Sequence, residues 1–361
     1  MVSDDSSPQS LAALGLSAGD PDRSRDGQGP GRDPERMHVK RKLRSRRSLS
    51  DQVFRAIARA GGSVALIIMI LVGTFLAVRA LPALHKAGWS FLTTQQWSPN
   101  GGGFGIAAIM VGTALIALVA LAVSGPLALG TALYISEYAP RSVQRFLIAT
   151  IDLMAAVPSV IFGMWGAYLL QWRLDSVARW LSDWFYWIPP LSVPGVKRDD
   201  PLATMTTYTA STFMAGVVVG LMITPIASSI MREAFSQAPV GEREGAYALG
   251  ATRWGMIRAV VLPFGKGAMI GGTMLGLGRA LGETMAVLLI ISPVFAINWH
   301  ILQHGTSSVS STIALYFAES TPMGVSALFA AGLALFGVTL LVNFIAARIV
   351  ARSRSGAVSE A

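Results

Sequence analysis

The amino-acid sequence predicts an all-α integral membrane protein with six transmembrane helices, and three observations support this fold class. The 361-residue chain is 52% hydrophobic and only 14% charged, with a mean hydropathy of +0.52, whereas soluble domains carry about 25% charged residues. Long uncharged runs recur along the chain, each long enough to cross a hydrocarbon core of about 30 Å as a helix. The 29 Lys and Arg residues are spread unevenly over the segments between these runs.

Residues 1–55 are predicted to form a disordered, basic cytoplasmic tail. The segment is rich in Ser, Asp, Gly, Pro and Arg, so it cannot bury a core, and it has no apolar run typical of a secretory signal peptide. Its most basic stretch, residues 40–47, could contact RNA, but beside a hydrophobic span it is more simply a topology and lipid-headgroup signal. We therefore expect membrane lipid and no nucleic acid as a partner. The first transmembrane helix is predicted over residues 56–82.

The main transmembrane domain is predicted over residues 104–350, followed by a cytoplasmic tail at 351–361. Its apolar runs lie at residues 104–136, 153–172, 201–231, 267–318 and 320–347. The first of these has 33 uncharged residues and forms either one long tilted helix or two spans broken near Gly125 and Pro126. The run at 267–318 is expected to hold the fifth span, with two charges inside it.

The distribution of positive charge favours six spans with both termini in the cytoplasm. This arrangement places 22 Lys and Arg inside and six outside, whereas splitting the run at 104–136 gives 16 and 12. Residues 173–200 then face outward, and the stretch 174–187 is expected to lie along the membrane–water interface. Its aromatic residues are Trp180, Trp184, Phe185, Tyr186 and Trp187.

A polar segment at residues 240–263 separates the fourth and fifth spans on the cytoplasmic side. The sequence predicts a short helix at 244–249 that Gly250 terminates, and a second helix from Thr252 to about Leu262 that ends at Pro263. Two short helices joined at a glycine make a rigid knob. An ordinary surface helical hairpin is the alternative.

Two charged residues lie inside the fifth span. Arg279 is 12 residues beyond Gly267, hence about 18 Å into the membrane, and Glu283 follows four residues later, on the same helix face. A salt bridge that holds the helix in the bundle is one interpretation. The other is that Arg279 binds an anion in a transport path, because guanidinium is always charged and forms paired hydrogen bonds to oxyanions. Glu283 would then hold Arg279 or accept a hydrogen bond from a protonated oxyanion.

Asp152 and Pro158 lie near the start of the third span. The carboxylate of Asp152 is expected to cap that helix, and a gating role is the alternative. Prolines 126, 158 and 225 are expected to kink helices or to serve as hinges. The four histidines show no ligand spacing and the chain has no cysteine, so no metal or cofactor is expected. The glycines around Arg279 do not form a nucleotide-binding loop, because the required G-x-x-x-x-G-K-[ST] spacing is absent.

The segment 240–263 resembles the EAA loop of bacterial ABC importer permeases. The residues on the pattern are Glu244, Ala246, Gly250, Val260, Leu262 and Pro263. Gly245 replaces the usual second alanine and should loosen the helix by about 1 kcal/mol. The resemblance implies a type I permease of the MetI-like fold, in which Glu244, Gly245, Ala246, Gly250, Leu262 and Pro263 couple the chain to an ATPase.

A closer resemblance is to PstC-type permeases of phosphate ABC importers and covers roughly residues 55–350. It is carried by the segments 136–140, 152–159, 162–166 and 275–287. It implies a permease subunit in the bacterial plasma membrane that works with a PstA-type permease, two ATP-binding subunits and an extracytoplasmic phosphate-binding protein. ATP hydrolysis is expected in the separate subunit, and Arg279 and Glu283 in the translocation path.

Two other functions stay open from the sequence. Permeases for sulfate or molybdate share the coupling loop, so the anion is not decided by these residues. An ion-coupled secondary anion transporter is the alternative from another class, but it predicts internal repeats and more intramembrane carboxylates than this sequence has. A membrane scaffold would leave Arg279 and Glu283 without a role.

Overall fold

The computed structural model describes residues 49–101, 103–194 and 205–354. The chain divides into two compact units, Met1–Ala60 and Gly61–Ala361, and the described part of the first is the start of helix α1 (Leu49–Ala87). Residues 49–55, assigned to the tail from the sequence, are therefore helical. The rest of both predicted tails, 1–48 and 355–361, lies outside the described residues.

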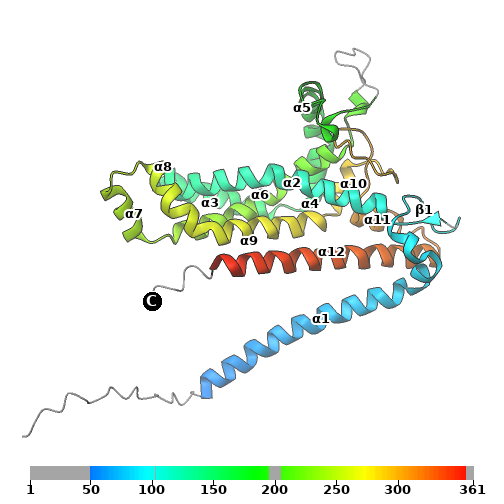
Figure 1. Ribbon diagram of the computed structural model, residues 1–361, viewed down its shortest axis with the longest axis horizontal. Coiled ribbons are helices and arrows are strands. Elements are labelled where there is room, and N and C mark those ends of the chain that lie inside the picture. Colours follow the sequence, from blue (N-terminus) through cyan, green and yellow to red (C-terminus); the bar gives the residue numbers. More distant parts are fainter. Residues whose placement is uncertain (1–48, 102, 195–204, 355–361) are drawn as a thin grey trace, which may run out of the picture. The chain divides into compact units, whose positions relative to one another are not determined.

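Within the described residues, five helices are long and apolar enough to cross a membrane. They are Gln52–Leu92, Ala107–Tyr138, Thr212–Ser236, Arg253–Leu281 and Pro322–Ala351 (Figure 1). A further pair of helices, Arg141–Ala156 and Ser159–Trp184, passes the same test as one broken span. Counted once, this pair completes the six spans that the sequence predicts.

The long apolar run at 104–136 forms one continuous helix. Helix α2 (Ala107–Leu133) passes through Pro126 and continues into the π-helical turn η2 (Tyr134–Tyr138). The alternative of two spans broken near Gly125 and Pro126 is therefore wrong. The single helix is consistent with the charge distribution, which favoured one span here.

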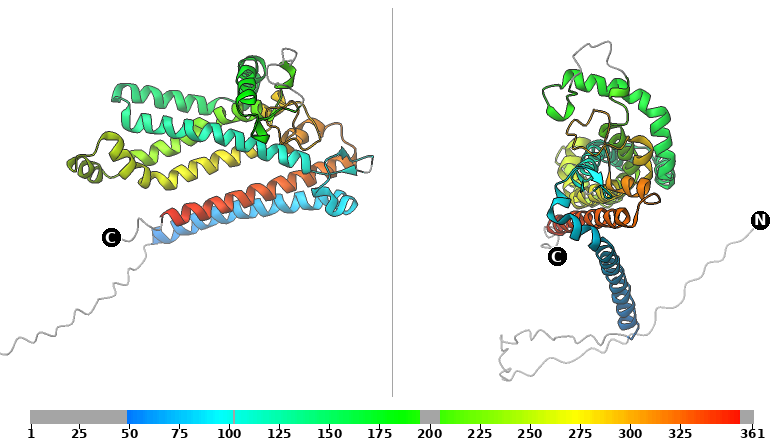
Figure 2. Two further views of the ribbon diagram at one scale, coloured as in Figure 1. Left: turned by 45° about the horizontal axis from the view of Figure 1, so that its top comes forward. Right: turned by 90° about the vertical axis from the view of Figure 1, so that its right-hand side faces the viewer.

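Helices α2 and α6 (Thr212–Ser236) pack along each other at the centre of the bundle (Figure 2). Glycines on α6 permit the close approach, because a Cβ atom at Gly220 would lie 2.9 Å from the carbonyl oxygen of Ala120. Small residues at helix contacts are typical of membrane proteins, where packing replaces the hydrophobic effect.

The third span is sharply bent, contrary to the continuous run 153–172 in the sequence. Helix α3 (Arg141–Ala156) ends before Pro158, and the chain resumes as α4 (Ser159–Trp165), the π turn η3 (Gly166–Leu170) and α5 (Gln171–Trp184). The two halves meet at 92°. Proline disfavours a helical conformation in the preceding residue, so the helix stops at Val157.

The run at 267–318 is also divided. Helix α9 (Leu262–Leu281) ends early, and two short helices follow, α10 (Met285–Ile290) and α11 (Val309–Tyr316). Beside them lies a two-stranded antiparallel hairpin of β1 (Trp97–Ser98) and β2 (Gly103–Phe104). Helix α12 (Pro322–Arg354) then returns toward the end of the bundle that carries α7 and α8 (Figure 1).

Candidate functional site

Arg279 and Glu283 do not share a helix face. Helix α9 ends at Leu281 with Gly282 as its C-cap, so Arg279 lies in the last turn and Glu283 in the link to α10. The predicted i, i+4 pair is therefore wrong. The continuous helix that carries Arg279 begins at Arg253, before the apolar run at 267–318. The helix therefore ends between the two charges.

Glu283 is buried, with 8% of its surface exposed. Its Oε1 atom accepts a hydrogen bond of 3.2 Å from the backbone N–H of Ala286. This N–H belongs to the first turn of α10 and has no partner within the helix. Glu283 therefore acts as a side-chain cap that holds α10 directly after the end of α9.

The guanidinium group of Arg279 lies on an exposed stripe of α9, together with Leu275, which is 53% exposed, and Gly282. The opposite face of α9 packs on α6, where Gly276 contacts Ile223. Among the described residues, Arg279 has no ion-pair or hydrogen-bond partner. A charged group on a membrane-spanning helix costs at least about 2.5 kcal/mol on insertion scales, and a partner would offset this cost.

The polar segment at 240–263 folds as a short helix and a tight turn, as the sequence predicts. Helix α7 spans Val240–Ala248. The N–H of Gly250 donates to Tyr247 and that of Ala251 to Ala246, which is a Schellman motif. Gly250 has φ of +81°, a conformation that glycine adopts without steric cost.

The second helix of this segment does not end at Pro263. Thr252 caps helix α8 (Arg253–Met256), which continues through the π turn η6 (Ile257–Val261) into α9. Pro263 lies two residues after this π turn, and the wider turn accommodates the proline ring within the continuous helix. The segment is therefore rigidly continuous with the fifth span.

The residues assigned to ATPase coupling divide into two groups. Glu244, Gly245 and Gly250 are exposed, as is Pro263. Ala246 and Leu262 instead pack on a hydrophobic cluster formed by α2, α6 and the α8–η6 segment, so they attach the knob to the bundle. Leu262 therefore packs against the bundle, whereas its neighbour Pro263 is exposed.

Sequence reasoning missed a set of exposed apolar side chains on the same knob. They are Val240 (67% exposed), Tyr247 (47%), Leu249 (91%) and Trp254 (55%). Large apolar residues inside an otherwise polar loop were the available signal. Exposed apolar side chains that gather on one feature typically mark a protein interface.

Asp152 does not cap the third span. It is exposed, four residues before the end of α3, and the N-cap of α4 is Pro158, without a side-chain cap. The capping interpretation is wrong because the helix break comes after Asp152. Pro158 lies at the 92° bend, so it remains the better placed of the two for a hinge.

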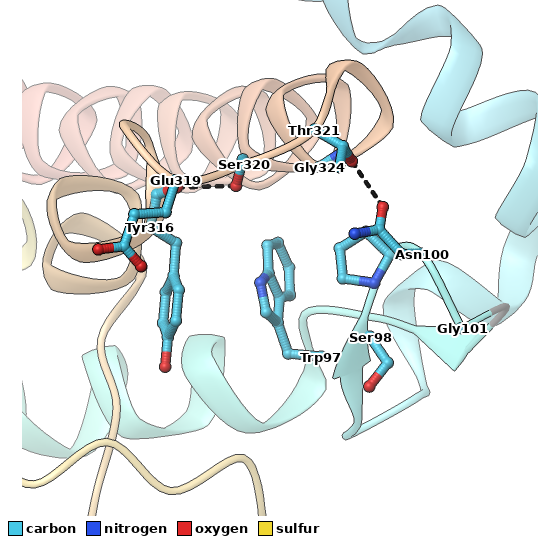
Figure 3. A pocket seen from close by; sticks show the side chains of 10 residues that line it. Trp97, Ser98, Asn100, Gly101, Tyr316, Glu319, Ser320, Thr321 and Gly324 are labelled. Carbon is cyan, nitrogen blue, oxygen red and sulfur yellow. Dashed lines mark hydrogen bonds between the residues drawn. The ribbon is translucent and has the colours of Figure 1, made fainter.

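A pocket of about 440 Å³ opens beside the β1–β2 hairpin. Trp97 and Tyr316 form its walls and the exposed carboxylate of Glu319 lies at its edge (Figure 3). Thr321 donates a hydrogen bond to Asn100 across the rim. No cluster of three or more metal-ligating side chains occurs here or elsewhere in the described ranges.

Comparisons with known proteins identify the family. Residues 124–355 match the family described as binding-protein-dependent transport system inner membrane component. The phosphate transport system permease protein PstC 2 of Mycobacterium bovis is 39% identical over 305 residues, which cover 83% of this chain and 91% of that protein. The chain belongs to the PstC-type permease family. The PstC protein of Mesorhizobium japonicum is 34% identical and covers 86% of this permease.

A solved structure supports the fold. One chain of a bacterial ABC transporter involved in the import of alginate superimposes with a TM-score of 0.52 and 18% identity, covering 84% of this permease and 98% of that chain. At this identity the likeness concerns the fold alone. The permease therefore has the multi-pass ABC importer fold predicted from its sequence.

Proposed function

We propose that this permease is the PstC-type subunit of an ATP-driven phosphate importer in the bacterial plasma membrane, with both termini in the cytoplasm. The relatives are named phosphate transport system permeases, which favours phosphate over sulfate or molybdate. The chain itself is not an enzyme, and ATP is hydrolysed by a separate subunit. An ion-coupled secondary transporter is not favoured by the family match.

The observation that carries this proposal is the rigid α7–α8 knob with its exposed apolar side chains. Leu249 is 91% exposed at the tip, next to the Gly250 turn. Such a side chain gains free energy when a partner covers it. The partner we propose is the ATP-binding subunit, present in two copies, one for this permease and one for a PstA-type partner permease. Glu244 and Gly245 lie on the same exposed helix and complete the docking surface.

The translocation path is proposed to run along the exposed stripe of α9. Arg279 lacks a partner within the described chain, and its guanidinium suits an oxyanion. The PstA-type permease would cover the stripe from the other side and exclude lipid. Glu283, through its bond to Ala286, holds α10 beside this path, and the bend at Pro158 is the proposed hinge of the gate.

The opposite end of the bundle is proposed to receive the extracytoplasmic phosphate-binding protein. The β1–β2 hairpin and its pocket lie at the end away from α7 and α8 (Figure 1). Trp97 and Tyr316 offer aromatic surface there, which is typical of protein interfaces.

Reconstitution tests the proposal. The permease is co-expressed with a PstA-type permease and the ATP-binding subunit, placed in vesicles and supplied with binding protein, ATP and radiolabelled phosphate. We expect uptake that requires ATP, survives collapse of ion gradients and resists excess sulfate or molybdate. Uptake driven by an ion gradient alone would contradict the importer, and competition by sulfate would contradict phosphate specificity.

A further inference from the structure

Glu137 is a buried carboxylate at the end of α2, in a place where the chain otherwise turns polar and exposed. We propose that Glu137, Arg243 and Arg253, here called the Glu137 latch, are positioning residues that transmit movement of the α7–α8 knob to helix α2. The inference rests on the proposed function, because it assigns the latch to coupling between the ATPase and the translocation path.

The contacts of the latch connect α7 and α8 to Glu137, and they connect α7 to the end of α6 as well. Arg243 Nη1 lies 2.9 Å from Glu137 Oε2, and the two side chains are 20% and 3% exposed, respectively. Arg243 Nη2 also donates to the carbonyl oxygen of Phe235, at the end of α6, at 2.6 Å. Arg253 donates to the carbonyl oxygen of Glu137, and its guanidinium lies 4.7 Å from the ring centroid of Tyr138. The knob is therefore attached to the ends of both central helices.

The backbone around Glu137 has a special geometry. Residues Tyr134–Tyr138 form a π turn, in which the N–H of Ala139 bonds to the carbonyl oxygen of Tyr134 at 2.8 Å. A π turn inserts one residue into a helix and rotates the residues that follow, and such turns are frequent at functional sites. Here the turn places Glu137 inward, although it lies at the polar end of the span.

The latch is only partly satisfied. Glu137 Oε1 and Arg243 Nε are buried and have no hydrogen-bond partner, and the neighbouring Ser136 Oγ has none either. Unsatisfied groups inside an ion pair lower its net stabilisation, so that its free energy lies close to that of alternative pairings. A purely structural brace gains nothing from such atoms. Spare donor and acceptor atoms instead allow the pair to exchange partners as the knob moves.

The mechanical consequence follows from the packing of the bundle. Helix α2 packs along α6 over its length, and α6 packs on α9, which carries Arg279. A displacement of the knob pulls on Glu137 and Phe235 together and thus moves the ends of both central helices. Without the latch, the knob would still be connected to α9 through the continuous helix Arg253–Leu281. Its side-chain contacts with the end of α2 would be lost.

The test uses the assembled importer in vesicles and measures the number of phosphate ions imported per ATP hydrolysed. Variants Glu137→Gln and Arg243→Gln are expected to lower this ratio at least fivefold, with ATP hydrolysis retained. The double variant is expected to resemble the worse single variant, because both substitutions break one link. Matched controls are Glu233→Gln and Arg145→Gln, which change exposed residues of the same types outside the latch, and they should keep the wild-type ratio.

The outcomes separate the latch from the proposed function. Absence of ATP-dependent phosphate uptake by the wild type overturns the proposed function, and the inference with it. Normal wild-type uptake with a Glu137→Gln ratio within twofold of the wild type overturns the latch alone. A double variant whose loss equals the product of the single losses also overturns it.

A second measurement tests the latch even if the glutamine variants insert poorly into the membrane. Arg243→Lys keeps the charge but lacks the guanidinium fork that contacts Glu137 and Phe235 at the same time. In the assembled complex we expect amide hydrogen exchange in residues 240–256 to rise at least tenfold, with the middle of α2 and α6 unchanged. Unchanged exchange in residues 240–256 would overturn the latch independently of transport.

Discussion

At the scale of single residues, the two charges near the end of α9 have different surroundings. Arg279 is exposed on a helix that crosses the membrane, and Glu283 is buried beyond the end of that helix. Gly282 separates them because it ends α9. Each charge must therefore be tested by its own substitution, since they do not form a pair that can be removed together.

Arg279→Lys should reduce phosphate uptake at least roughly tenfold without lowering membrane abundance. Lysine keeps the charge but loses the planar fork, and one hydrogen bond to a charged group is worth about 1.5–3 kcal/mol. Uptake by the reconstituted importer is the measurement, with immunoblotting for abundance. Arg258→Lys, at an exposed arginine earlier in the same continuous helix, is the control. Wild-type uptake by Arg279→Lys would exclude bidentate anion binding at this residue.

The cap formed by Glu283 predicts a difference between two substitutions. Glu283→Gln keeps an oxygen that accepts the bond from Ala286, so its thermal stability should stay near that of the wild type. Glu283→Leu loses this bond and should lower stability by about 1 kcal/mol. Thermal unfolding in detergent measures both. Equal stability of the two variants would show that Glu283 does not hold α10 through this bond.

At the scale of elements, the knob is defined by its turn. Helix α7 ends in a Schellman motif, and α8 continues as one helix to Leu281. The turn contains the glycine at φ +81°, and the helix before it contains Gly245, which has open space around its missing Cβ atom. The two glycines therefore differ in what an alanine would do.

Gly250→Ala should strain the turn by about 1–2 kcal/mol, because alanine resists the left-handed conformation. We expect the protein to insert into the membrane but to lose part of the coupling between ATP hydrolysis and phosphate import. A bulkier residue at this position should enhance the loss of coupling. Gly245→Ala is the comparison for backbone strain, since it should stabilise α7 by about 0.5–1 kcal/mol and leave the turn unstrained. Normal transport by Gly250→Ala and by a bulky variant would argue against a docking role for the turn.

At the scale of the whole molecule, the two functional ends of Gly61–Ala361 lie apart. The knob of α7 and α8 is at one end of the bundle and the β1–β2 hairpin is at the other (Figure 1). This arrangement suits a permease that meets an ATPase on one side of the membrane and a binding protein on the other. The charge distribution predicts that the knob faces the cytoplasm.

Single cysteines test this orientation, because the chain has none of its own. Val143→Cys, in the first turn of α3, should react with an impermeant thiol reagent only from the cytoplasmic side. Pro190→Cys should react only from the outside. Intact cells and inverted vesicles give the two sides, and labelling of both cysteines from the same side would contradict the six-span topology.

The sequence by itself determined the features that depend on local composition. Uncharged runs predicted the spans because the membrane tolerates few charges, and Gly250 predicted the turn because its conformation excludes most other residues. The spacing from Glu244 to Pro263 indicated an ABC importer permease, and other segments, such as 275–287, indicated the PstC type. These signals are local, so no knowledge of the fold was needed to read them.

Only the tertiary structure decided which helices continue and which break. Pro126 lies within the continuous helix α2, and Pro263 follows a π turn in another continuous helix, whereas Pro158 lies at a 92° bend of the third span. The tertiary structure also separates Arg279 from Glu283, and it brings Glu137 into contact with Arg243, which lies 106 residues further along the chain. Breaks and long-range pairs depend on the packing of segments far apart in sequence, and periodicity within one segment carries no information about that packing.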